Sequence, residues 1–180
     1  EEHIKFPNIV DGNWNAEKPI QIVVSDMTVF KNNGKNWEWT LLVDTFNNEI
    51  IAHQATPIAG SNKPYYHCLE VLKTLAGKKN EEQTPQVVFH TDQGSVYSSQ
   101  AFCQAHKHYN ILRSMSEAGT PTDNAIIEAL NGWIKEELYL DFDLETAEDV
   151  LKLLDEYVHY FNNRRPAAAL GYKSPVQYKT

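Results

Sequence analysis

The 180-residue chain has only two cysteines, Cys68 and Cys103, and no long uninterrupted apolar run. Two cysteines cannot form the disulfide framework of a small secreted domain, so the sequence favours a reducing, cytoplasmic setting. Without a long apolar run, a membrane-spanning helix is excluded. The sequence also lacks an initiator Met and a signal-peptide pattern, which indicates a piece of a longer protein whose missing part lies upstream.

Basic residues are also in short supply, with 16 Lys and Arg against 24 Asp and Glu and a formal net charge of −8. That sign is wrong for a free-standing nucleic-acid binder. The stretch 136–156 holds nine acids and one base, however, so the rest of the chain is balanced. A nucleic acid could approach the balanced part, although a solvated helical face is the commoner meaning of such a run. Affinity for DNA would then come largely from elsewhere.

The apolar pattern predicts one α/β domain. Runs rich in β-branched residues predict strands at 20–30, 37–46, 49–56, 86–90 and 111–115. Helical spacing predicts helices at 65–76, 99–108, 124–138 and 146–161, with caps at Ser98 or Ser99 and at Thr146. A strand meander followed by alternating helices and strands implies a five-stranded mixed sheet with helices on both faces. Residues 1–19 are predicted to be an extended lead-in or linker, and 20–180 the domain.

Three acidic residues occupy positions where a solvated surface charge is not expected. Asp26 lies inside the first apolar strand, Asp92 follows the fourth, and Glu128 lies early in a helix between apolar neighbours. Burying an ionised carboxylate costs several kcal/mol unless it is paired or binds a metal. If the two strands pair in parallel, about 4.8 Å apart, both aspartates reach one point, and a helix over that edge can add the third carboxylate. Such oxygens suit Mg²⁺ or Mn²⁺, and two such ions support phosphodiester chemistry.

Four strings in the chain carry a family resemblance: SDMT at 25–28, HTDQGSVYSS at 90–99, SMSEAGTPTDNAIIEALNGWIKEEL at 114–138 and NNRRPAAALGYKSPVQY at 162–178. Together they resemble the integrase-like (DDE) catalytic core of bacterial insertion-sequence transposases and, more distantly, retroviral integrases. The resemblance covers roughly residue 19 to the C terminus. Between Asp92 and Glu128 lie 35 residues, the spacing typical of that family's Asp, Asp, Glu triad.

This resemblance implies a ribonuclease H-like fold and a metal-dependent polynucleotidyl transferase that performs 3′-end cleavage and strand transfer of an insertion element. Asp26, Asp92 and Glu128 would be the catalytic residues and the ligands of two Mg²⁺ or Mn²⁺ ions. Asp123 and Asn124, matching the family's Asp-Asn pair, would lie next to the site. The implied partners are DNA, as element ends and target, an upstream helix-turn-helix domain outside this chain, and further copies of the protein assembled on DNA.

Three positions depart from the family's pattern. Glu117 stands where a basic residue is usual, Gln93 where Arg is frequent, and Ala167 where a His commonly follows the Arg-Pro pair. The triad stays intact, but two cationic contacts to DNA phosphate are lost. Two alternatives therefore remain open: a catalytically idle remnant that acts as a protein-interaction module, and a simple metal-dependent nuclease of the same fold.

Other candidate residues have simpler explanations. Asp44 precedes an Asn-rich turn and is expected to cap it. The C-x-x-H-x-H string at 103–108 suggests zinc, but only its first two members share a helix face, so a chance arrangement is favoured. His90 is expected to be a strand histidine with satisfied hydrogen bonds rather than a base. The arginine pair at 164–165 fits either a DNA phosphate contact or the dipole at a helix C terminus.

Overall fold

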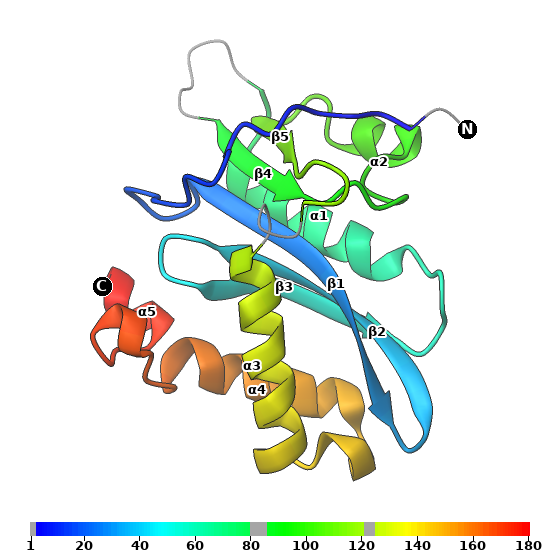
Figure 1. Cartoon of the computed structure of the whole chain (residues 1–180), viewed down its shortest axis with the longest axis vertical. Helices are drawn as coiled ribbons and strands as arrows, with labels where there is room; N and C mark the ends of the chain where they lie inside the picture. The colour runs from blue at the N-terminus through cyan, green and yellow to red at the C-terminus, as the bar shows by residue number, and fades with distance from the viewer. Residues whose placement is uncertain (1–2, 80–85, 121–124) are drawn as a thin grey trace.

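The computed structural model describes residues 3–79, 86–120 and 125–180 (Figure 1). The five strands are β1 (Ile22–Asn32), β2 (Lys35–Asp44), β3 (Glu49–Thr56), β4 (Val87–Thr91) and β5 (Ile111–Met115). They form one sheet in the order β3-β2-β1-β4-β5. The β1–β2 and β2–β3 pairs are antiparallel, whereas β4 pairs in parallel with both β1 and β5. The predicted five-stranded mixed sheet is confirmed.

Helices cover both faces of this sheet. They are α1 (Lys63–Ala76), α2 (Gln100–Ala105), α3 (Ala125–Asp141), α4 (Val150–Asn163) and α5 (Pro175–Lys179), with short 3₁₀ turns η2 (Leu144–Thr146) and η3 (Ala168–Leu170). Alternation along the strands feeds two cores: Val24 and Leu41 pack with α3 and α4, and their neighbours Val23 and Leu42 pack with α1 and α2. Across the described ranges, no helix is long and apolar enough to cross a bilayer.

The predicted start of the last long helix is wrong. Thr146 closes the 3₁₀ turn η2, and Ala147 is extended, with φ −60° and ψ 136°, so the helix cannot run through it. The helix α4 begins at Val150 instead. Its cap is Asp149, whose side chain accepts a hydrogen bond from the backbone N–H of Lys152 at 3.1 Å.

Other predicted boundaries shift by a few residues: the strand expected at 37–46 is Lys35–Asp44, and the helix expected at 124–138 is Ala125–Asp141. The Ser99 cap is confirmed, since its hydroxyl accepts a hydrogen bond from the backbone N–H of Phe102 at 3.2 Å, but α2 ends at Ala105 rather than at residue 108. The first strand runs on to Asn32 because the turn is confined to Asn33 and Gly34, which both have positive φ. These differences are extensions or truncations of elements that the sequence placed correctly.

The N-terminal segment 3–16 lies along β5 and β4 (Figure 1). The backbone N–H of Ile9 donates to the hydroxyl of Ser114 at 2.9 Å. The ring of Trp14 meets that of His90 edge to face, with 5.1 Å between their centroids. This segment therefore packs against β4 and β5. The predicted division of the chain into a lead-in at 1–19 and a domain at 20–180 stays a prediction.

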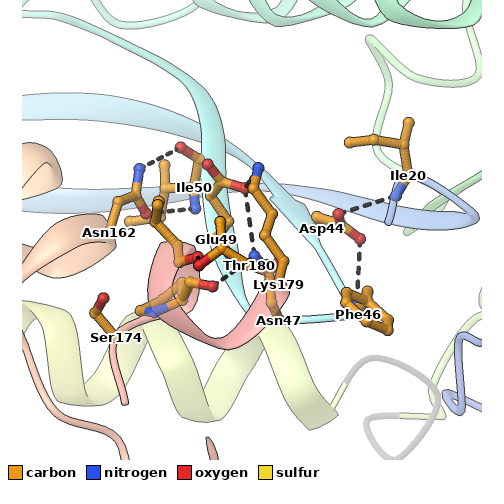
Figure 2. Close-up of polar contacts among 12 residues, drawn as sticks. Ile20, Asp44, Phe46, Asn47, Glu49, Ile50, Asn162, Ser174, Lys179 and Thr180 are labelled. Atoms are coloured by element: carbon orange, nitrogen blue, oxygen red, sulfur yellow. Dashed lines mark hydrogen bonds and ion pairs between the residues drawn. The ribbon is translucent and has the colours of Figure 1, made fainter. Parts of the chain in front are cut away.

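The C-terminal helix α5 returns to the turn between β2 and β3 (Figure 2). Lys179 forms an ion pair with Glu49 at 2.7 Å across this contact. At the end of β2, the buried carboxylate of Asp44 accepts hydrogen bonds from the backbone N–H groups of Ile20 at 2.9 Å and Phe46 at 3.0 Å. The turn-capping role expected for Asp44 is confirmed.

Candidate active site

Strand pairing places Asp26 and Asp92 beside each other. The strands β1 and β4 run parallel, with Val24 opposite His90. Asp26 and Asp92 each lie two residues beyond this pair, Asp26 still within β1 and Asp92 just past the end of β4. Because side chains alternate along a strand, Asp26 shares the face of Val24, the face covered by α3. The helix α3 carries Glu128 in its first turn.

The three acids predicted from the sequence line one pocket of about 290 Å³. Its remaining walls come from the residue after Asp92 and from the chain that follows β5, namely Gln93, Ser116, Glu117, Ala118, Gly119 and Thr120. The structure thus lines one pocket with Asp26 from inside β1, Asp92 from the chain just after β4, and Glu128 from the first turn of α3. The predicted neighbours Asp123 and Asn124 lie outside the described residues.

The carboxylate of Asp26 sits in a negatively charged and partly buried environment. One oxygen accepts a hydrogen bond from the backbone N–H of Met27 at 2.9 Å. The pKa of Asp26 is raised to about 6, chiefly by burial and also by the charges of Asp92 and Glu128, while the hydrogen bond from Met27 acts in the opposite direction. The pocket therefore concentrates negative charge that a cation would neutralise.

A glycine holds the second carboxylate in place. The backbone N–H of Gly94 donates to Oδ1 of Asp92 at 2.7 Å. A Cβ at position 94 would lie only 2.8 Å from that oxygen, closer than side-chain carbons come to an oxygen in folded proteins. Any other residue at position 94 would therefore push this carboxylate oxygen away from its present place. The Asp-Gln-Gly order in the sequence is the signal for this local cap.

The sequence reasoning missed Asn131. This buried residue follows Glu128 by one helical turn, and its side-chain amide lies 3.4 Å from Oδ2 of Asp26. Its carbonyl oxygen Oδ1 is buried and has no hydrogen-bond partner among the described residues. Its i, i+3 spacing places it on the helix face of Glu128, but no local pattern in the sequence indicates its contact with Asp26.

His90 has the structural role expected from its place in a strand. Its ring is buried, and its two nitrogens hydrogen-bond the hydroxyls of Ser114 at 2.8 Å and Ser116 at 2.9 Å. Ser116 in turn lines the pocket. His90 therefore supports the pocket wall from behind.

The far half of α3 is fixed against α4. Glu137 accepts hydrogen bonds from Nε of Arg165 at 2.6 Å and from the hydroxyl of Tyr157 at 2.7 Å. Arg165 is thus engaged in an ion pair inside the protein. These contacts hold the C-terminal half of α3 against α4, whereas Glu128 lies in the first turn of the helix.

The donor set fits a hard divalent cation. Across the described residues, no three His, Cys, Asp or Glu side chains are grouped so as to hold a metal ion. Carboxylates of like charge that line one pocket repel each other, and a bound cation would offset that repulsion. Carboxylate oxygens, with the unpaired amide oxygen of Asn131 close by, are the ligand type that Mg²⁺ and Mn²⁺ prefer.

The mixed sheet, with one acid inside β1, one after the parallel neighbour β4 and one on a covering helix, is a ribonuclease H-like domain. Solved integrases share this fold. One chain in a simian T-cell lymphotropic virus intasome, in complex with a PP2A regulatory subunit, superposes with a TM-score of 0.76 at 21% identity over 99% of this chain and 59% of that one. The HTLV-2 integrase catalytic core domain in complex with magnesium gives 0.67 at 19% identity, over 92% of this chain and all of that one.

The sequence comparison gives the family. Two models described as integrase core domain match residues 16–121 and 104–175, so the chain belongs to the integrase core domain family. A putative transposase of insertion sequence IS150 from Escherichia coli is 30% identical over 96% of the chain, and the IS904 transposase of Lactococcus lactis is 27% identical over 96%. The chain spans 59% and 66% of the lengths of these two relatives.

Proposed function

We propose that this chain is the catalytic domain of an insertion-element transposase, which cleaves DNA at the 3′ ends of the element and joins them to target DNA. The observation that carries the proposal is the convergence of Asp26, Asp92 and Glu128 on one pocket. Family membership and the transposase relatives support the same activity. In this proposal the three carboxylates hold two Mg²⁺ or Mn²⁺ ions.

Bound ions of this kind activate the attacking oxygen and stabilise the leaving oxygen of a phosphodiester. The chain's own residues prepare the site for them. Backbone N–H groups of Met27 and Gly94 each donate to one carboxylate oxygen, of Asp26 and of Asp92 respectively, and so restrict how these side chains can turn. Asn131 bridges from α3 to Asp26 and so links the helix that carries Glu128 to the strand.

The proposed partners follow from the same family. They are the DNA of the element ends and of the target, an upstream helix-turn-helix domain, and further copies of the protein on DNA. Asp123 and Asn124 are proposed to lie near the pocket, because the helix that carries Glu128 begins directly after them. The balanced part of the chain is the surface proposed to meet DNA.

One feature of the pocket favours a second candidate, a catalytically idle remnant. The described residues that line the pocket include Glu117 and Gln93 but neither Lys nor Arg. A phosphodiester entering this pocket therefore gains no direct cationic contact from those walls. A remnant of this kind would keep the fold without the reaction.

A branched DNA substrate tests the proposal on the chain alone, because it presents an already joined element end and removes the need for end recognition. The wild-type chain with Mg²⁺ or Mn²⁺ should resolve the branch and rejoin the target strand. Asp92→Asn should fold but lose at least about 10³-fold in rate, since removing a ligand costs several kcal/mol of transition-state stabilisation.

The matched control is Asp149→Asn, which removes one exposed carboxylate far along the chain and keeps a good helix cap. It should react at the wild-type rate. Strand release without rejoining would indicate a simple nuclease, and no reaction by the wild-type chain would indicate the idle remnant. Wild-type activity in Asp92→Asn would contradict the assignment of the site.

A further inference from the structure

The segment that follows Asp92 is tied back to β1 by one buried tyrosine. Tyr97 is only 3% exposed, and its hydroxyl lies 2.9 Å from the hydroxyl of Ser25. Ser25 is itself buried and directly precedes Asp26. Tyr97 also lines, with both aspartates, a second pocket of about 240 Å³ next to the first. This single contact therefore connects the chain around one acid with the chain around the other.

A second set of bonds holds the same segment from β5. Arg113 is buried, and its Nη2 donates to the backbone carbonyl of Tyr97 at 3.3 Å and to the hydroxyl of Thr91 at 3.1 Å. Thr91 in turn donates to the backbone carbonyl of Asp92 at 2.9 Å. The stretch from 91 to 97 is thus braced at both ends by buried hydrogen bonds.

Ring packing fixes the direction of the Tyr97 hydroxyl. The ring contacts Tyr65, Phe89 and Phe102 edge to face, with centroids 5.2, 6.5 and 5.7 Å away. A phenylalanine would make the same ring contacts. Burying a hydroxyl pair costs desolvation, and replacing both partners with apolar groups of the same shape is often nearly neutral for stability. The hydrogen bond between Tyr97 and Ser25 is therefore better explained by its effect on the relative position of the two chain segments than by a contribution to the free energy of unfolding.

We propose that Tyr97, through Ser25, is a positioning residue that sets the separation and orientation of Asp26 and Asp92. The inference rests on the proposed role of these acids as metal ligands. Groups that orient metal ligands typically contribute 10- to 100-fold to metal affinity or activity. Tyr97 acts through the backbone of the residue next to the ligand, so we expect an effect near the lower end, about 10-fold.

The test compares Tyr97→Phe, Ser25→Ala and the double variant with the wild-type chain. Mn²⁺ affinity is measured by electron paramagnetic resonance, without DNA. All three variants should bind Mn²⁺ about 10-fold more weakly, and the double variant should be no weaker than either single variant, because both remove the same bond. The double variant should also unfold at close to the wild-type urea concentration, which separates positioning from general destabilisation.

The matched control is Tyr157→Phe, which removes a buried tyrosine hydroxyl bonded to Glu137, away from the pocket. It should lower the urea midpoint and leave Mn²⁺ affinity unchanged. Hydrogen exchange in EDTA adds a metal-free readout: backbone amides of residues 92–98 should exchange faster in Tyr97→Phe than in wild type or Tyr157→Phe. With branched DNA, Tyr97→Phe should lower kcat and leave KM unchanged.

The outcomes separate this inference from the proposed function. Equal Mn²⁺ affinity in wild type, Tyr97→Phe and the double variant would overturn the positioning role and leave the metal site standing. A wild-type chain that binds no Mn²⁺ would overturn both. A loss in Tyr157→Phe as large as in Tyr97→Phe would show that the effect is only structural and would also overturn the inference.

Discussion

Asp26 shows what a candidate metal ligand does to the protein before any metal binds. Its pKa is raised to about 6 by burial and by the charges of Asp92 and Glu128, so its ionised form is less stable in the folded chain than in the unfolded one. The stability of the folded protein is unaffected by this group below pH 3.8 and falls as pH rises through about 6.

Asp26→Asn should therefore raise the free energy of unfolding by about 1 kcal/mol in EDTA at pH 7, after allowance for solvent screening. The asparagine keeps an oxygen to accept the hydrogen bond from Met27. Urea denaturation measures the effect, and repeating it near pH 4 should show the gain disappear. A variant less stable than wild type at pH 7 would show that Asp26 is held by favourable contacts instead.

Glu117 is a second residue whose charge decides how the pocket treats DNA. It lines the pocket with the three acids, at a position where the resembling family usually has a basic residue. Glu117→Lys should strengthen binding of the branched DNA about 3- to 10-fold and steepen the dependence of affinity on salt, because each added phosphate contact releases counterions. Fluorescence anisotropy at several salt concentrations measures both quantities. Unchanged affinity at low salt would place the DNA away from this wall.

Site residues that stand out within a single strand or helix could be predicted from the sequence, whereas those that depend on packing between elements could not. Asp26 and Asp92 were predictable because each interrupts or ends an apolar strand, and Glu128 because of its spacing from Asp92. Asn131 and Tyr97 were not, since they act on partners 105 and 72 residues away in the chain. No local pattern carries that information; only the packing of α3 and of the 92–98 segment against β1 does.

Helix ends show the same limit on a smaller scale. Thr146 and Asp149 both lie just before an apolar helical pattern, and both residue types make good caps. The sequence therefore allowed either start. In the structure, residues Leu144–Thr146 form a 3₁₀ turn in which Leu144 is fully buried in the core, and the helix therefore begins after Asp149. Tertiary packing thus decided between two locally acceptable beginnings.

The end of α2 carries a pH-dependent contribution to stability. His106 is buried there, and Nδ1 donates to the backbone carbonyl of Phe102 at 2.8 Å. Its pKa is lowered to about 4, chiefly by burial and also by the nearby charges of Arg113 and Lys73, while the hydrogen bond to Phe102 acts in the opposite direction. Between pH 6.5 and about 4 the unfolded chain takes up a proton that the folded chain does not, so stability falls as pH falls through this window.

His106→Asn keeps a donor for Phe102 and removes the titrating ring. The wild-type chain should lose about 1 to 2 kcal/mol more stability than this variant between pH 7 and pH 5. Urea denaturation of both proteins at the two pH values gives the difference. Parallel losses in the two proteins would mean that His106 is protonated as easily when folded as when unfolded.

In the molecule as a whole, the excess acidic residues lie apart from the candidate active-site pocket. The acidic stretch 136–156 covers the second half of α3, η2 and the first half of α4. None of the described residues that line the pocket belongs to this stretch. The fold thus keeps the excess negative charge on α3 and α4 (Figure 1), whereas the pocket is lined by residues of β1, of the chain after β4 and β5, and of the first turn of α3. In the proposed function, DNA therefore approaches the pocket rather than α4.

Mn²⁺ titration of the whole chain and three charge-removing variants tests the account most directly. Wild type should bind Mn²⁺. Asp26→Asn, Asp92→Asn and Glu128→Gln should each bind it at least about 10-fold more weakly, because each variant replaces a negatively charged carboxylate ligand with a neutral amide. Asp149→Asn, which loses the same charge elsewhere, should bind as wild type does. Equal Mn²⁺ binding by all five proteins would contradict the claim that these three carboxylates form one metal site.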